Sequence, residues 1–281
     1  MDQLGGKVAV VTGGAGGIGL AMAEAFAGQG MRVAVADIDA ERAEAAAAGL
    51  RGSGAEAAAF GVDVADPASV EALRDAVLER FATVHLLVNN AGVALRRPFL
   101  EATPEDWQWV FSVNVFGVVH GLRAFLPTLA EGPPGTRHVV TTASMSGVRV
   151  GVTGSQTLYA GSKFALVGLS EALRAELAPL GIGLSVLLAG PFRTDLATTS
   201  QRSRELSDRG PAAPQPPMAQ VPADFYDPAR VGPMVLDALA RNLPYIVTHP
   251  QFWPQVASHH DRLGEAFADA ARRDGLATDP P

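Results

Sequence analysis

The 281-residue sequence predicts an α/β domain in which helices cover both faces of a doubly wound parallel sheet. Three observations support this prediction. Short apolar runs alternate with longer amphipathic segments, the runs are continuously apolar as in strands buried on both faces, and no break in composition divides the chain. The expected strands span residues 8–12, 32–37, 57–64, 85–90, 138–144, 184–190 and 245–248.

Helices are expected in the segments that connect these strands. They cover residues 18–30, 40–49, 67–80, 105–130, 158–179 and 228–241. Because crossovers between parallel strands are right-handed, the carboxyl ends of the strands lie along one edge of the sheet. Ligands of such sheets bind at that edge, so the site is expected there.

Two later segments depart from the alternation, within what we expect to be one domain over residues 1–281. Residues 195–227 carry polar residues and a proline cluster in place of a packed helix, which favours a substrate-binding lid over a disordered insertion. Phe225 and Tyr226 at its end either close over an apolar ligand or anchor the loop to the body. Residues 251–281 are expected to form an amphipathic helix and a frayed tail.

Composition argues against several partners and sites. The net charge of −7 and the pI near 5.4 argue against binding to nucleic acid or to an anionic membrane, and favour a small molecule or another protein. The absence of cysteine excludes disulfides, thiolate catalysis and Cys-ligated metals. His259 and His260 would point about 100° apart on a helix, so we expect no metal site. The N-terminal apolar run is short and follows no basic region, which favours a cytoplasmic protein.

A glycine-rich turn, VVTGGAGGIG, connects the first expected strand to the first expected helix. Glycines permit a tight turn and let backbone N–H groups approach a pyrophosphate at the helix N-terminus, where the dipole favours negative charge. A glycine cluster alone is weak evidence. Here it ends a strand, opens a helix and precedes a second strand that ends in Asp37, so it predicts a dinucleotide site.

Asp37 predicts the choice of cofactor. It lies 18 positions after Gly19, near the spacing at which an acid accepts hydrogen bonds from the adenosine ribose. A carboxylate there repels a 2′-phosphate, and no Arg or Lys stands within the turn or directly after Asp37. NAD is therefore favoured over NADP. The alternative role for Asp37, which Asp39 could also fill, is a helix N-terminal cap.

The stretch TLYAGSK places Tyr159 four positions before Lys163 at the start of an expected helix. As a short pattern it is compatible with two surface residues that share one helical face. However, only Lys7 and Lys163 among the 22 basic residues are lysine. A chain that uses arginine almost everywhere else retains an ammonium at 163, which indicates that this position needs lysine chemistry.

Taken together, these residues resemble those of the classical short-chain dehydrogenase/reductase family. The resemblance covers residues 7–195, about two thirds of the chain, with its motifs in family order. The matching elements are TGGAGGIG (12–19), Asp37, Asp63, NNAG (89–92), Asn114, Ser144 in ASMSG, Tyr159 and Lys163 in YAGSK, and Thr194 in GPFRTDL.

The resemblance implies a seven-stranded Rossmann-type domain that transfers a hydride between nicotinamide and a carbonyl or alcohol carbon. It implies that Tyr159 is the general acid/base, Ser144 binds the substrate oxygen, Lys163 holds the nicotinamide ribose and Asn114 supports a water-linked proton relay. Asn114 can also be a satisfied polar residue that bridges backbone inside a helix, and this interpretation is compatible with the relay role. The expected cofactor contacts are Gly13, Gly17, Ile18, Gly19, Asp37, Asp63, Val64, Asn90, Ala91, Gly92, Tyr159, Lys163, Phe192 and Thr194.

Elementary electrostatics agrees with these roles. A lysine ammonium and the positive oxidised nicotinamide stabilise the phenolate of Tyr159. Lowering a phenol pKa from ~10 to ~7 requires roughly 4 kcal/mol, and burial opposes this change, so the charges must dominate. Ser144 can donate to the substrate oxygen, where negative charge grows during ketone reduction. Ser146 points to the same strand face, and the S-x-x-G pattern with Gly147 favours Ser144.

Two departures from the family pattern affect the substrate pocket. Ala189 stands where a proline is usual, and Phe192, where a smaller aliphatic residue is common, would narrow or stack beside the nicotinamide pocket. The segment between Ser144 and Tyr159 is also slightly longer than in many members. A stripe of small residues on the next helix favours a homodimer or homotetramer over packing on the protein's own sheet; it comprises Ala165, Gly168, Ala172 and Ala175.

The leading hypothesis is an NAD-dependent oxidoreductase that interconverts a secondary alcohol and a ketone on a small to medium apolar substrate. One alternative is a catalytically idle NAD-binding redox sensor or scaffold, which the complete Ser, Tyr, Lys and Asn set disfavours. The other is a dehydratase or epimerase with the same site. Such relatives generally carry a larger sugar-nucleotide domain, and only about 85 residues follow Thr194.

Overall fold

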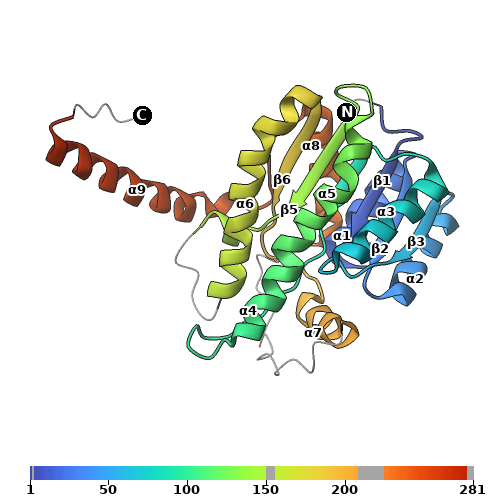
Figure 1. The fold of residues 1–281 in the computed structure, drawn as a ribbon, viewed down its shortest axis with the longest axis horizontal. Helices are drawn as coiled ribbons and strands as arrows, with labels where there is room; N and C mark the ends of the chain where they lie inside the picture. Colours follow the sequence, from blue (N-terminus) through green and yellow to red (C-terminus); the bar gives the residue numbers. More distant parts are fainter. Residues whose placement is uncertain (2, 150–155, 208–224, 277–281) are drawn as a thin grey trace.

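The computed structural model describes residues 1, 3–149, 156–207 and 225–276, which form a seven-stranded sheet with helices on both faces (Figure 1). The strand order is β3-β2-β1-β4-β5-β6-β7, and every pairing is parallel. The strands are β1 (Val8–Thr12), β2 (Arg32–Asp37), β3 (Ala57–Gly61), β4 (Leu86–Asn89), β5 (Arg137–Thr142), β6 (Ile182–Leu188) and β7 (Tyr245–Val247).

The helices pack as two layers because alternate residues of each strand point to opposite faces. Val8 and Val10 of β1 join the core under one layer, whereas Ala9 and Val11 join the core under the other. The first layer comprises α3 (Pro67–Phe81), α4 (Pro104–Phe111), α5 (Gly117–Ala130) and α6 (Thr157–Leu177). The second comprises α1 (Gly17–Gly28), α2 (Ala40–Gly52) and α8 (Val231–Arg241).

The predicted doubly wound fold is therefore confirmed, with boundaries that shift by a few residues. The third strand ends at Gly61, so Asp63 and Val64 follow it instead of belonging to it. From β1 the strands β2 and β3 follow in one direction, whereas β4 to β7 follow in the other. The carboxyl ends of β1 and β4 therefore flank a crevice at this switch point.

The helix expected over 105–130 is interrupted. Residues Ser112–Phe116 form a π-helical turn between α4 and α5, in which the N–H of Gly117 donates to the carbonyl of Ser112 five residues earlier. By length and composition the run Pro104–Ala130 could cross a membrane, but 56% of its most apolar window is buried inside the protein. Phe125 and Leu129 lie in the core, so this run is a core helix.

The segment 195–227 differs from the sequence expectation. Leu196–Leu206 forms a helix, α7, where no packed helix was expected, and residues 208–224 of the segment lie outside the described residues. The sequence of α7 is mostly polar, and Ser200 is its one buried residue. Polar contacts that are distant in sequence hold it: the hydroxyl of Ser200 accepts from the backbone N–H of Ala94 at 3.0 Å.

The amphipathic helix expected after residue 251 is present as α9 (Trp253–Asp274). It starts beside α6, where His259 contacts Phe164 with ring centroids 6.0 Å apart. Figure 1 shows that it then leaves the body and projects away from the sheet. No residue of α9 is buried.

Candidate active site

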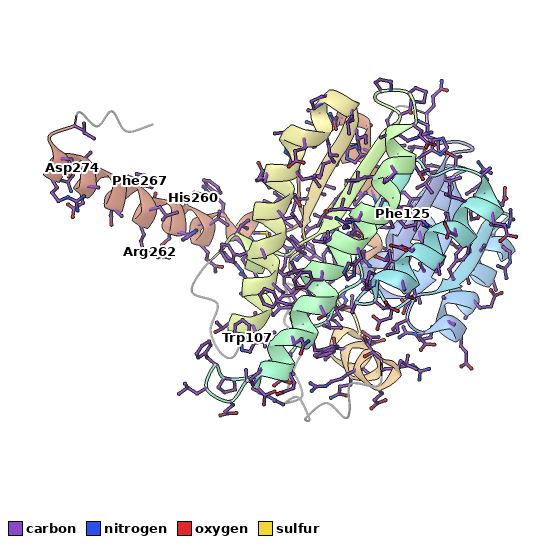
Figure 2. The ribbon with its side chains drawn as sticks, in the orientation of Figure 1. Trp107, Phe125, His260, Arg262, Phe267 and Asp274 are labelled. Atoms are coloured by element: carbon purple, nitrogen blue, oxygen red, sulfur yellow. The ribbon has the colours of Figure 1, made fainter. Side chains whose placement is uncertain are left out.

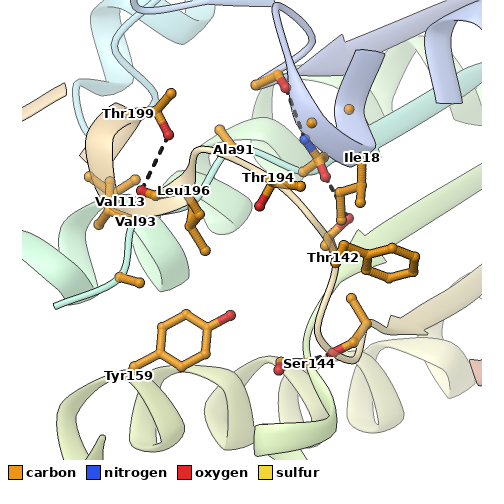
Figure 3. Close-up of a pocket in the computed structure, with 18 of the residues that line it drawn as sticks. Ile18, Ala91, Val93, Val113, Thr142, Ser144, Tyr159, Thr194, Leu196 and Thr199 are labelled. Carbon is orange, nitrogen blue, oxygen red and sulfur yellow. Dashed lines mark hydrogen bonds between the residues drawn. The ribbon is translucent and has the colours of Figure 1, made fainter. Parts of the chain in front are cut away.

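A cavity of about 420 Å³ runs along the carboxyl ends of the strands. Its walls come from the turn after β1, the loops after β2, β3, β4, β5 and β6, and the helices α6 and α7. Every residue that the sequence predicted for catalysis or cofactor contact lies on this wall, except Asn114. Figure 3 shows Tyr159 and Ser144 on one side of the opening, with Ile18, Ala91 and Thr194 across it.

The glycine-rich turn can adopt its conformation only with glycine at several positions. Gly13 and Gly17 have φ of 63° and 55°, in the left-handed region that side chains disfavour. A Cβ on Gly13 would lie 2.8 Å from Cα of Ala91, and one on Gly19 would lie 2.1 Å from the carbonyl oxygen of Gly13. The turn therefore presents bare backbone at the start of α1, which fits a pyrophosphate.

The NNAG segment supports this turn. The side-chain amide of Asn90 donates to the carbonyls of Thr12 and Gly13 at 3.0 and 3.1 Å. The hydroxyl of Thr12 accepts from the backbone N–H groups of Asn90 and Ala91 at 3.0 and 3.1 Å. Asn90 therefore supports the glycine-rich turn as well as lining the cavity. Sequence reasoning missed Thr12, although its place at the end of β1 was visible. Asn89, the first residue of the NNAG motif, is buried against Gly121.

Asp37 lies at the end of the cavity beyond the glycine turn. Its two carboxylate oxygens accept from the backbone N–H groups of Ala15 and Asp39, each at 3.2 Å. Burial raises the pKa of Asp37, and these two hydrogen bonds oppose the rise. Asp39, not Asp37, is the N-terminal cap of α2, because its side chain accepts from the N–H of Arg42. Asp37 is thereby left for a ligand.

Arg42 is a residue that the sequence interpretation did not use. A Cβ on Gly16 would lie 2.7 Å from the guanidinium of Arg42. Arg42 also forms part of the cavity wall near Asp37. A cation thus stands beside the acid at this end of the cavity. Asp63 and Val64 complete this end: the Asp63 carboxylate accepts from the N–H of Ala65 at 2.9 Å, so its turn is fixed.

Tyr159 and Ser144 face each other at the other end of the cavity (Figure 3). Burial raises the pKa of the Tyr159 phenol, and a hydrogen bond with Ser144 lowers it. The Ser144 hydroxyl donates to the carbonyl of Ala189 at 3.1 Å and accepts from the N–H of Ser146. Ser146 therefore helps to orient Ser144. Gly147 is required beneath them because its Cβ would lie 2.6 Å from the carbonyl oxygen of Lys163.

Lys163 lies one helical turn after Tyr159 and is buried. Its Nζ donates to the carbonyl of Thr142 at 2.9 Å and lies 5.7 Å from the centroid of the Tyr159 ring. Burial lowers the pKa of Lys163 to about 8, so the ammonium form still predominates at pH 7. A positive charge is therefore held beside the phenol, and the pairing is not a surface coincidence.

Asn114 lies in the π-helical turn and is fully buried. Its Oδ1 accepts from the N–H of Val93 at 2.8 Å, and its Nδ2 donates to the carbonyl of Val93 and to the hydroxyl of Ser162. The satisfied-polar interpretation is thus correct. The side chain ties the loop after β4 to α6, because Ser162 in turn donates to the carbonyl of Tyr159 at 2.7 Å.

The loop after β6 is held by aromatic contacts. Phe192 forms an isolated bridge with Tyr226, and the Tyr226 ring stacks on His249 with centroids 4.0 Å apart. A Cβ on Gly190 would lie 2.2 Å from the His249 ring, so only glycine fits there. Tyr226 therefore anchors the segment to the body, whereas Phe225 lines the cavity.

A helix that sequence reasoning missed covers the cavity. Leu196, Ala197 and Thr199 of α7 contribute to the wall (Figure 3). Arg202 forms an ion pair with Asp39, and Arg204 pairs with Asp106 at 2.8 Å. These long-range ion pairs have no local signature beyond the arginines themselves.

The chain matches the family model "short chain dehydrogenase" over residues 7–205. It is 34% identical over 269 residues, 95% of this chain and 90% of the relative, to the 1-deoxy-11-beta-hydroxypentalenate dehydrogenase of Streptomyces avermitilis. A short-chain dehydrogenase/reductase from Burkholderia phymatum, solved in complex with NAD, is 34% identical with a TM-score of 0.83, covering 100% of this chain and 99% of that one.

A second solved structure shows that the cofactor varies among similar proteins. A short-chain dehydrogenase from Burkholderia cenocepacia, in complex with NADP, is 31% identical with a TM-score of 0.73 over 88% of this chain and 97% of that one. A nicotinamide cofactor is therefore supported. The glycine cradle, the ordered site residues and these matches together show that the chain belongs to the short-chain dehydrogenase/reductase family of oxidoreductases.

Proposed function

We propose that this protein is an NAD-dependent dehydrogenase that interconverts a secondary alcohol and a ketone on a small to medium apolar substrate. The observation that carries the proposal is the convergence of Tyr159, Ser144 and the buried Lys163 at one end of the cavity. The hydroxypentalenate dehydrogenase relative, by its printed name, acts on a hydroxylated substrate, which agrees with this class.

The cavity fits a nicotinamide cofactor. Bare backbone at Gly13 and Gly17 would receive the pyrophosphate, Asp37 the adenosine ribose, and Thr194 the carboxamide. Ile18, Asp63, Val64, Ala91, Gly92 and Phe192 would complete the contacts. When bound, the cofactor supplies the hydride acceptor or donor, and its oxidised ring adds a positive charge near Tyr159.

The residues of the chain would handle the substrate oxygen and its proton. In ketone reduction, Tyr159 donates a proton to that oxygen, and Ser144 stabilises the negative charge through a hydrogen bond. In alcohol oxidation, the Tyr159 phenolate accepts the proton, and the Lys163 ammonium stabilises the phenolate. Asn114 would position the Tyr159 backbone through Ser162 and support a water-linked proton relay.

We favour NAD because Asp37 accepts two backbone hydrogen bonds and keeps its carboxylate at the adenosine end, where a 2′-phosphate would be repelled. The remaining parts of the proposal are a cytoplasmic protein, with residues 195–227 as the substrate lid, that assembles as a homodimer or homotetramer. Exposure of Gly168, Ala172 and Ala175 on α6 supports assembly, because this small-residue stripe does not pack on the protein's own sheet.

The test measures NADH absorbance with a panel of secondary alcohols, and NADH consumption with the matching ketones. The wild type is expected to turn over at least one pair, and Tyr159→Phe is expected to lose about 100-fold or more in kcat while NAD still binds. Equally negligible rates for both proteins, with NAD binding intact, would favour the idle sensor or scaffold. Product epimerisation or dehydration without net NADH change would favour the dehydratase or epimerase hypothesis.

A further inference from the structure

The helix α9 is attached to the body only through its beginning. Val256 packs against the core, His259 contacts Phe164, and Gln255 accepts from Arg149 at 2.7 Å. Beyond His259, the side-chain hydrogen bonds of the described part of α9 stay within the helix, as between Arg262 and Ser258. Figure 2 shows His260, Arg262, Phe267 and Asp274 standing clear of the body.

One face of α9 is an apolar seam. Large or aliphatic side chains recur at alternating spacings of three and four residues, the pattern of a helix that packs against another helix. The seam consists of Trp253, Val256, His260, Leu263, Phe267 and Ala270. The opposite face carries six of the helix's seven charged residues: Asp261, Arg262, Glu265, Asp269, Arg272 and Arg273.

The large apolar side chains of the seam are exposed to solvent. Trp253, Leu263 and Phe267 are 65%, 48% and 76% exposed. Burial of large apolar side chains stabilises a helix, so the uncovered seam forgoes that stabilisation. Helices gain most of their stability from packing of the amphipathic face. The geometry therefore calls for a partner along the seam.

The charges of α9 argue against a membrane as that partner. Helices that lie on anionic lipid carry an excess of lysine or arginine on the polar face. Here the acids slightly outnumber the bases: Asp261, Glu265, Asp269 and Asp274 stand against Arg262, Arg272 and Arg273. The acidic protein as a whole adds to the repulsion.

We propose that α9 pairs antiparallel with α9 of a second copy of this chain. Two-fold pairing centred between His260 and Leu263 sets Trp253 opposite Ala270 and His260 opposite Leu263. It also sets Phe267 against the exposed part of Val256, whose remaining surface packs on its own core. In the two outer pairs a large side chain meets a smaller one, as interlocking cores require. One flank of the seam carries only small residues, which permit the close approach of two helices: Ala257, Gly264 and Ala271.

This arrangement brings the end of each α9 toward the partner's body. A helix of 22 residues is roughly 33 Å long, comparable to the width of a small domain. Each body would then contact two copies of α9, its own and that of the partner. The contact is separate from the small-residue stripe on α6 and from the cavity, so it does not depend on the proposed reaction.

The absence of cysteine allows a register-specific test. The double variant Trp253→Cys/Ala270→Cys should form a covalent dimer on mild oxidation, seen on a non-reducing gel and reversed by reductant. The two positions of one chain are 17 residues apart on a helix, roughly 25 Å, so they cannot bridge within it. The matched control Trp253→Cys/Ala268→Cys moves one thiol to the polar face. A monomer from the first variant, or equal dimer from both, overturns the proposal.

A second measurement does not depend on disulfide chemistry. Sedimentation equilibrium of the full chain should give half the wild-type mass for Phe267→Glu, whereas Ala268→Glu, with the same change of charge one residue away, should keep it. Equal masses for the two variants contradict the pairing. NAD binding and circular dichroism should be unchanged in both variants, because neither residue contacts the cavity or the sheet.

Discussion

Arg204 of α7 donates a hydrogen bond of 2.8 Å to the carboxylate of Asp106 at the start of α4. The Asp106 carboxylate is 1% exposed and also pairs with Arg97. Its other contact is with the N–H of Thr103, through which it completes the capping box of α4. One buried acid thus ties the helix that covers the cavity to the body.

Loss of this ion pair should weaken both the fold and the binding of cofactor. In Arg204→Met the Asp106 carboxylate keeps Arg97 and Thr103, so we expect a loss of about 1–3 kcal/mol in unfolding free energy. Because α7 lies over the cavity, KM for cofactor should rise several-fold with a smaller change in kcat. Urea unfolding and initial rates measure both. Arg241→Met, which breaks an exposed pair with Asp237, should change neither by more than about 0.5 kcal/mol or twofold.

The Arg204–Asp106 ion pair should make the free energy of unfolding sensitive to acid. Burial alone would raise the pKa of Asp106, but the hydrogen bonds from Arg204 and Thr103 and the nearby guanidinium charges of Arg97 and Arg204 lower it overall. A depressed folded-state pKa means that the stabilisation is present above the unfolded value of about 3.8 and is lost as pH falls below it. Unfolding free energies of wild type and Arg204→Met should therefore converge as pH falls below 4 and through the folded-state pKa of Asp106. A gap that widens as pH falls would contradict the assignment.

Lys163 should show opposite effects on activity and stability. Burial lowers its pKa from 10.5 to about 8, so folding with a charged Lys163 costs about 3 kcal/mol below pH 8, and the cost is relieved as pH rises toward 10.5. Lys163→Met should lose about 100-fold or more in kcat/KM, yet unfold no more easily at pH 7. Its stability should also rise less between pH 8 and 10.5. A variant that is much less stable at pH 7 would show that the hydrogen bond to Thr142 outweighs the burial cost.

The proposed preference for NAD rests on Asp37. The wild type should use NAD with a higher kcat/KM than NADP, and Asp37→Ala/Ile38→Arg should shift the ratio toward NADP by about tenfold or more, since a repulsive carboxylate is replaced by a cation. Arg42 already stands nearby and would assist the variant. A wild type that prefers NADP would show that Arg42 dominates Asp37.

The two serines can be separated by substitution. Ser144→Ala removes a hydrogen-bond partner of Tyr159 and the proposed oxyanion donor, so kcat should fall by about 100-fold or more. Ser146→Ala keeps the backbone N–H that orients Ser144, so its kcat should remain within about threefold. A larger loss for Ser146→Ala would transfer the substrate-binding role to that residue.

The sheet and the cofactor cradle could be predicted because their signals are local. Apolar strands, the glycine turn and Asp37 lie within one βαβ unit, where spacing constrains geometry. The helix α7 could not be predicted in this way, because Arg202 and Arg204 form ion pairs with acids on other elements. These acids lie more than ninety residues away in sequence. The position of α9 was also hidden: its periodicity predicted an amphipathic helix but not that its apolar face would be left uncovered.

The π-helical turn over Ser112–Phe116 has a consequence for how this site tolerates change. A π turn holds one more residue than the α turn that would replace it. Deletion of a single residue there would restore a regular α-helix and leave α4 and α5 nearly in register, because the π turn absorbs the extra residue. The local bulge that carries Asn114 would be lost, however, and with it the hydrogen bonds that join Asn114 to Val93 and Ser162. One feature of the candidate site thus depends on an extra residue in a helix, which a scan of point substitutions does not test.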